Sequence, residues 1–216
     1  MARIFDDGAG WPAVHEFWFP PGLDEAGAET HAAMFARWFG GGTNRELPPF
    51  APMVESARAG RLDRWLAHPT GRLSLILLLD QFSRGLFAGT PEAYAADPLA
   101  LRIAQEGIRA GHYDALARPW EMTFFIMPLA HAEGPDHLAR LDHVVILTLE
   151  LTRSVPPDLG PLYTFSACQA RAHREVITRF GRYPHRNAIL GRASTPDEVA
   201  YLATGDLVHT RRPPAE

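Results

Sequence analysis

The sequence predicts an all-α protein of about eight or nine helices joined by short connections. Apolar residues recur at helical spacing along most of the 216-residue chain, and residues typical of helix ends punctuate the pattern. Few stretches alternate with the period of two that a half-buried strand needs. With 46% hydrophobic and 21% charged residues, the chain can form its own core. We expect one domain over 1–216, with flexible ends at 1–10 and 209–216.

The first half of the chain shows helix signals of increasing strength. Apolar patterning predicts four helices here: 12–18, 26–39, 48–59 and 70–87. The last of these is apolar almost all round, which is typical of a central, buried helix. Asp97 and Pro98 then look like an N-cap followed by proline at the first helical position, and this helix is expected to end at Gly111.

The second half carries the clearest helix boundaries. A helix is expected over 119–132, where the internal Pro128 should kink or end it. Asp136 opens the next helix. A further helix runs from Pro161 to Gly181.

The last predicted helix begins with a capping box. Thr195 is the N-cap and Glu198 stands three residues on, so each side chain can bond the other's backbone N–H.

Composition excludes several kinds of chemistry. All 21 residues of the Lys+Arg count are arginines. Schiff-base enzymes, pyridoxal phosphate enzymes and P-loop NTPases need a lysine amine, so they are excluded. Cys168 is the single cysteine, which excludes intramolecular disulfides, Cys-ligated iron–sulfur clusters and multi-Cys zinc sites. We expect Cys168 to be an inert thiol in the core, and we expect no cofactor.

Charge and hydropathy favour a cytoplasmic protein without membrane or nucleic-acid partners. The net charge is −4. The first ten residues lack the apolar segment of a signal peptide. The longest apolar run, at 75–79, is far shorter than the ~18 residues of a spanning helix. Residues 171–192 are rich in arginine, but an acidic chain without lysine is a poor candidate for binding nucleic acid.

The first candidate site lies in the central helix. Asp80 falls on the same apolar stripe as its neighbours, where a carboxylate is costly unless it is paired. Arg84, four residues on, is the obvious partner. This pair either fixes helix packing or lines a pocket, together with Gln81.

The second and third candidates are histidines: one at the end of a helix and one beside the apolar stripe of another helix. His131 and Glu133 end an apolar helix, and their i,i+2 spacing points them apart, so a joint metal site on one helix is not expected. The alternative is a helix-end cap. His173, four residues after Gln169, is either a hydrogen-bonded core histidine or a catalytic one.

The fourth candidate is the turn after Gly181. It concentrates Arg182, His185, Arg186 and Asn187 around a proline. Arginine forks suit bidentate binding of carboxylate or phosphate. The turn is therefore either an anion site or a brace for buried carboxylates.

Long motifs resemble the bacterial family called domain of unknown function 924. The segments "VHEFWFP", "GRLDRWLAHPTGRLSLILLLDQFSRGLF", "FFIMPLAHAEG" and "RAHREVITRFGRYPHRNAILGRASTPDEVAYL" carry the resemblance, from Val14 to Leu202. It implies antiparallel helix pairs in a tetratricopeptide-like right-handed superhelix. It carries no established activity. One departure is visible: the family pattern reads Pro-Arg-Asn where this chain has Ser83-Arg84-Gly85.

The family's recurrent residues coincide with the polar candidates. The resemblance maps them onto Asp80, Gln81, Phe82, Arg84, His131, Glu133, His173, Phe180, Gly181, Arg182, Pro184, His185, Arg186 and Asn187.

Two functions stay open at this point. In the first, polar residues from four segments converge on a pocket for an anionic small molecule. His131 or His173 would be the acid or base, Asp80 or Glu133 its orienter, and arginines the clamp.

In the second, the helices form a scaffold for a peptide or protein partner and the polar residues only brace the core. Aromatic residues near the start of the chain would then form an exposed patch, or a homodimer interface, instead of core: Trp11, Trp18, Phe19, Trp38 and Phe39.

Overall fold

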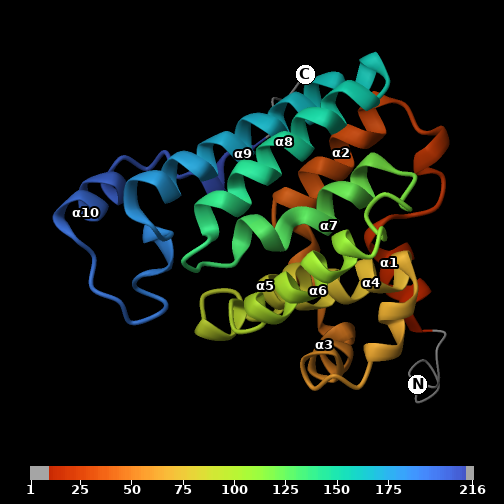
Figure 1. Cartoon of the computed structure of the whole chain (residues 1–216), viewed down its shortest axis with the longest axis horizontal. Helices are drawn as coiled ribbons and strands as arrows, with labels where there is room; N and C mark the ends of the chain where they lie inside the picture. The colour runs from red at the N-terminus through yellow and green to blue at the C-terminus, as the bar shows by residue number, and fades with distance from the viewer. Residues whose placement is uncertain (1–9, 213–216) are drawn as a thin grey trace.

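The computed structural model describes residues 10–212, and every regular element in that range is helical (Figure 1). The all-α prediction is therefore confirmed. The α-helices are α1 (Gly10–Trp18), α2 (Ala28–Phe39), α3 (Ala51–Arg58), α4 (Pro69–Ile76), α5 (Ser83–Leu86), α6 (Asp97–Arg109), α7 (Pro119–His131), α8 (His137–Ser154), α9 (Gly160–Phe180) and α10 (Pro196–Ala203).

The number of helices also agrees with the prediction. α4 continues without a break through the π-helical segment η5 (Leu77–Phe82) into α5. If these three are counted as one helix, the ten labelled α-helices of residues 10–212 become nine. The ends expected to be flexible are 1–10 and 209–216. Of these, residues 1–9 and 213–216 lie outside the described residues. No helix in the described range is long and apolar enough to span a bilayer.

The central helix is buried as its apolar sequence predicts. Its residues from Gly71 to Asp80 are all buried, including Leu73, Ile76 and Leu77, which are completely inaccessible to solvent. α1, α6 and α7 pack around it. This burial is what places Asp80 inside the protein.

An aromatic cluster fills the space between the central helix and α7. The ring of Phe124 lies 5.4 Å from Trp18, 5.6 Å from Phe19 and 5.2 Å from Trp38, in edge-to-face arrangements. Phe82 joins it, 5.3 Å from Trp18. Trp18, Phe19 and Trp38 are thus core residues and not an exposed patch, whereas Trp11 and Phe39 are half-buried.

α8 and α9 form a long pair on one side of the molecule, lying side by side in Figure 1. A short connection of residues 155–159 joins them, so they run antiparallel. α9 ends at Gly181, which adopts φ 69° as a left-handed cap. That glycine ends the helix where the sequence predicts, and the Arg/His-rich turn follows it.

Other predicted boundaries have mixed outcomes. The capping box of α10 is present, with the Glu198 N–H bonded to the Thr195 hydroxyl. The Asp97 prediction was wrong: Ala96 is the N-cap, and Asp97 is the first helical residue with its side chain engaged elsewhere. Pro128 does not end α7, which continues three residues to His131, so of the two predicted effects only the kink stays a prediction.

Candidate functional site

Asp80 is the centre of a buried hydrogen-bond network. It lies on the π-helical segment η5 and is completely inaccessible to solvent. His131 Nδ1 lies 2.8 and 2.9 Å from its two carboxylate oxygens. Arg84 Nη1 donates to Oδ1 at 2.7 Å and Gln81 Nε2 donates to Oδ2 at 2.5 Å. Short π-helical segments often occur at functional sites, because they redirect side chains from the regular helical face.

The charge state of Asp80 determines the tautomer of His131. Burial alone would raise the pKa of the Asp80 carboxyl, but the charge on Arg84 and the hydrogen bonds from His131 and Gln81 hold that pKa below its usual range. An ionised carboxylate only accepts hydrogen bonds, so the proton of neutral His131 must sit on Nδ1. Nε2 then carries a lone pair. Among the described residues Nε2 has no hydrogen-bond partner, and the side chain is 21% exposed.

A second carboxylate, Asp97, extends the network. Arg84 Nη2 donates to it at 2.9 Å and Arg186 Nη1 at 3.1 Å. The Arg186 guanidinium lies between two aromatic rings, 4.4 Å from the centre of Tyr94 and 4.8 Å from that of Tyr183. Asp80, Arg84, Asp97 and Arg186 thus form an alternating chain of charges that is balanced overall.

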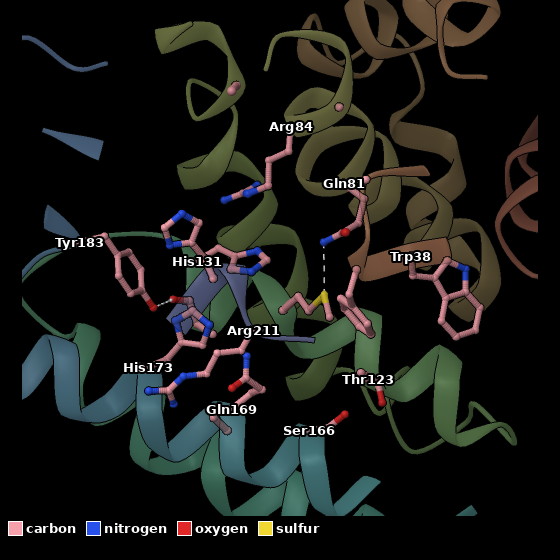
Figure 2. A pocket seen from close by; sticks show the side chains of 18 of the residues that line it. Trp38, Gln81, Arg84, Thr123, His131, Ser166, Gln169, His173, Tyr183 and Arg211 are labelled. Atoms are coloured by element: carbon pink, nitrogen blue, oxygen red, sulfur yellow. Dashed lines mark hydrogen bonds between the residues drawn. The ribbon is translucent and has the colours of Figure 1, made fainter. Parts of the chain in front are cut away.

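A pocket of about 430 Å³ opens beside this network. Figure 2 shows Gln81 and Arg84 on one side of it, with His131, His173 and Tyr183 gathered at one end. The predicted residues that line it are Gln81, Arg84, His131, His173, His185 and Arg186. Asp80 lies directly behind His131. The four segments, far apart in sequence, that carried the four candidates therefore all contribute to one cavity.

The wall of this pocket is rich in nitrogen and has no carboxylate from the described residues. Its arginines and histidines are Arg84, Arg186, Arg211, His131, His173, His185 and His209. The carboxylates that pair with these arginines do not line the pocket: Asp80 and Asp97 are buried, and Asp206, the partner of Arg211, is exposed to solvent. The surface that a ligand would touch therefore presents N–H donors.

Two of the histidines are uncharged at neutral pH. Burial lowers the pKa of His173 to about 3, and its Nδ1 is buried with no hydrogen-bond partner in the described chain. Burial also lowers the pKa of His185 to about 2; its ring stacks on that of His209 at 3.7 Å. These rings offer hydrogen bonds to a ligand without adding charge.

Three predicted residues do not line the pocket and form a brace beside it. Arg182 donates through Nε and Nη2 to both oxygens of Glu198, at 2.7 and 2.8 Å. Asn187 also donates to Glu198, at 3.1 Å. Glu133 accepts the Tyr183 backbone N–H at 2.7 Å and pairs with Arg192. These bonds fix the turn after Gly181 and so position Arg186.

Some residues of the site escaped the sequence analysis. Asp97 was interpreted as a cap, and Tyr94 carried no signal. His209 and Arg211 reach the pocket from a segment that was expected to be a flexible end. Only the Arg211-Arg212 pair could have drawn attention to it.

The prediction for Cys168 was wrong: this residue is exposed on α9 and is not a core thiol. A helix face cannot be assigned from apolar neighbours alone when both flanking faces carry apolar residues.

A family model described as bacterial protein of unknown function (DUF924) matches residues 14–206. The chain belongs to the DUF924 family. The resemblance inferred from the four motifs is confirmed, and every site residue predicted from the sequence lies inside the matched range, whereas His209 and Arg211 lie beyond it. No match is found among the curated proteins.

This DUF924 chain is also similar to a solved structure. That structure is of a protein of unknown function, ATU0120, from Agrobacterium tumefaciens, with 35% sequence identity and a TM-score of 0.68. The match covers 93% of this chain and 100% of the other.

No group of three or more His, Cys, Asp or Glu side chains within residues 10–212 has a geometry that could hold a metal ion.

Proposed function

We propose that the pocket binds a small molecule that carries a carboxylate or phosphate group. One observation supports this most: the wall combines three arginines and four histidines with no carboxylate of its own. Charge-assisted bonds from arginine to an oxyanion are among the strongest hydrogen bonds in proteins. The pocket volume of about 430 Å³ also falls in the range of about 300–1,000 Å³ that is usual for ligand sites.

Oriented donors, more than net charge, would hold the anion. Arg84 and Arg186 are balanced by Asp80 and Asp97, so the buried network is neutral. Arg186 keeps donor capacity nonetheless, because its Nε is buried and has no partner in the described chain. A buried donor without a partner costs stability, and a ligand oxygen would remove that cost.

His131 is the acid–base group of the proposed site. In its neutral form Nε2 is a proton acceptor that Asp80 holds in place, which is how a carboxylate orients a catalytic imidazole. The doubly protonated ring instead presents an N–H at Nε2, which can donate to a ligand anion. His173, the second candidate, would contribute a hydrogen bond from its neutral ring.

Acetate and inorganic phosphate test the proposal, with backbone ¹H–¹⁵N NMR spectra as the readout. We expect either ion to shift signals of pocket residues at millimolar concentration. Arg211→Ala should weaken binding about fivefold or more, since it removes a charged donor from the wall and a hydrogen bond to a charged group is worth about 1.5–3 kcal/mol. Arg174→Ala is the matched control, because Arg174 forms a similarly exposed pair with Asp142 outside the pocket. The proposal fails if neither ion shifts these signals, or if both variants behave alike.

We also propose that the helix pairs follow a tetratricopeptide-like superhelix, which the antiparallel α8–α9 pair supports. In the scaffold alternative, a peptide would occupy the same helices and the anions would not bind. The burial of Trp18, Phe19 and Trp38 favours the small-molecule pocket, because it removes the aromatic patch that the scaffold hypothesis used.

A further inference from the structure

We propose that the ligand of this pocket is an amphipathic acid: a carboxylate or phosphate group joined by a short linker to an apolar body about the size of an aromatic ring. This inference rests on the proposed function, because it assumes that the Arg/His end holds the anionic group. It adds the chemical class of the rest of the molecule.

The two ends of the pocket differ in chemistry. Figure 2 shows His131, His173, Tyr183 and Arg211 toward one end, and Trp38 and Thr123 toward the other. The anionic group therefore has one natural position, and the remainder of a ligand must extend toward Trp38.

Apart from its arginines and histidines, the pocket wall is largely apolar. Apolar side chains of this wall come from α2, α7, α8 and α9: Trp38, Phe39, Ile126, Met127, Val144 and Phe165. Trp38 presents only its ring, because its Nε1 already donates to the Trp18 carbonyl at 2.8 Å. Asn44 adds an amide to the wall, but no charge.

Three of the hydroxyl groups in this wall already donate to their own helices and have no hydrogen left for an anion. Thr123, Thr148 and Ser166 each donate to the carbonyl four residues earlier in their own helix, at 2.9, 2.9 and 3.3 Å. Their hydrogens are therefore already used. A carboxylate placed here would lose its hydration for few replacement bonds, those of the neutral Thr43 hydroxyl and Asn44 amide, which is unfavourable. The wall thus disfavours a second anionic group and accepts an apolar one.

Apolar burial would make the body of the ligand the main source of affinity. Each buried methylene group strengthens binding about fourfold. An acid with an aromatic ring should therefore bind much more tightly than its head group alone, even if the ring is only partly covered.

Calorimetry with three probes tests this inference on the full-length chain. The probes are 3-phenylpropionate, acetate as the head group alone, and 3-phenylpropanol as the uncharged body. We expect 3-phenylpropionate to bind at least about tenfold more tightly than either of the others.

Phe165→Gln supplies a second test. Phe165 is half-buried and lines the pocket, whereas Phe180 on the same helix is half-buried and lies outside it. Phe165→Gln should bring the affinity for 3-phenylpropionate down toward that for acetate and leave acetate binding unchanged. The matched variant Phe180→Gln should change neither.

The outcomes separate this inference from the proposed function. If acetate binds and 3-phenylpropionate binds no more tightly, the amphipathic ligand is wrong and the anion pocket stands. If the alcohol binds as tightly as the acid, the head-group assignment is wrong and the inference falls. If no anion binds at all, the proposed function itself fails.

Discussion

Replacing Asp80 by asparagine removes one charge from the centre of the network while keeping the side-chain shape. Each carboxylate oxygen accepts two hydrogen bonds, since His131 contacts both, Arg84 bonds Oδ1 and Gln81 bonds Oδ2. In either orientation of the asparagine amide, its NH₂ group would face N–H donors of His131 and of Arg84 or Gln81, and could accept from none of them. Arg84 would keep only Asp97 as a carboxylate partner.

The expected cost follows from the burial of the pair. Asp80 is fully buried and Arg84 is 21% exposed, and breaking such a pair by removing one partner costs about 3–5 kcal/mol. For a chain of this length, 1 kcal/mol corresponds to about 2–4 °C in Tm, so Asp80→Asn should lower Tm by roughly 6–20 °C. The matched control Asp142→Asn, in an exposed pair with Arg174, should cost under about 1 kcal/mol.

The difference between wild type and variant should depend on pH. The pKa of Asp80 is lower in the folded protein than in the unfolded chain, so its stabilisation is full above the unfolded value and is lost as pH falls. Denaturant unfolding should show a constant loss in Asp80→Asn from pH 7 to 5. This loss should shrink below about pH 4, where wild-type Asp80 begins to lose the same stabilisation. A loss under 1 kcal/mol at pH 7, or one that does not change with pH, would refute an ionised Asp80.

Three further predictions concern stability and accessibility. Thr195→Ala should cost about 1 kcal/mol in denaturant unfolding, because it removes the hydroxyl that caps the Glu198 N–H; no loss would mean that the cap is unimportant. Gly107→Ala should destabilise by about 1 kcal/mol in the same assay: its Cβ would lie 2.6 Å from the Phe125 ring, and this overpacking exceeds the gain in helix propensity. A net gain would show that the ring moves aside. Cys168 should react with a thiol reagent in the native protein, since it is exposed; reaction only after unfolding would place it in the core.

Local sequence signals predicted the parts of the fold that depend on local physics. Gly181 ends α9 because a left-handed residue is needed there, and the Thr195–Glu198 capping box requires only residues three apart. The Asp80–Arg84 pair was predictable for the same reason, since residues four apart share a helix face.

The features that the sequence did not predict depend on contacts between residues far apart in the chain. Asp97 looked like a cap because aspartate is common there, but two arginines from other segments take its side chain instead. His131 was known to be near a helix end, yet only the fold brings it to Asp80, 51 positions away. Arg211 reaches the pocket through packing of the final segment, which no periodicity encodes.

A crystal structure of the protein soaked with 3-phenylpropionate, grown without phosphate or sulfate, is the most direct test of the pocket. We predict that the carboxylate lies within hydrogen-bond distance of His131 Nε2 and an arginine of the wall, with the ring toward Trp38. An empty pocket at a saturating concentration of the acid, or a ligand whose carboxylate points toward Trp38, would contradict the assignment of the Arg/His end as the anion site.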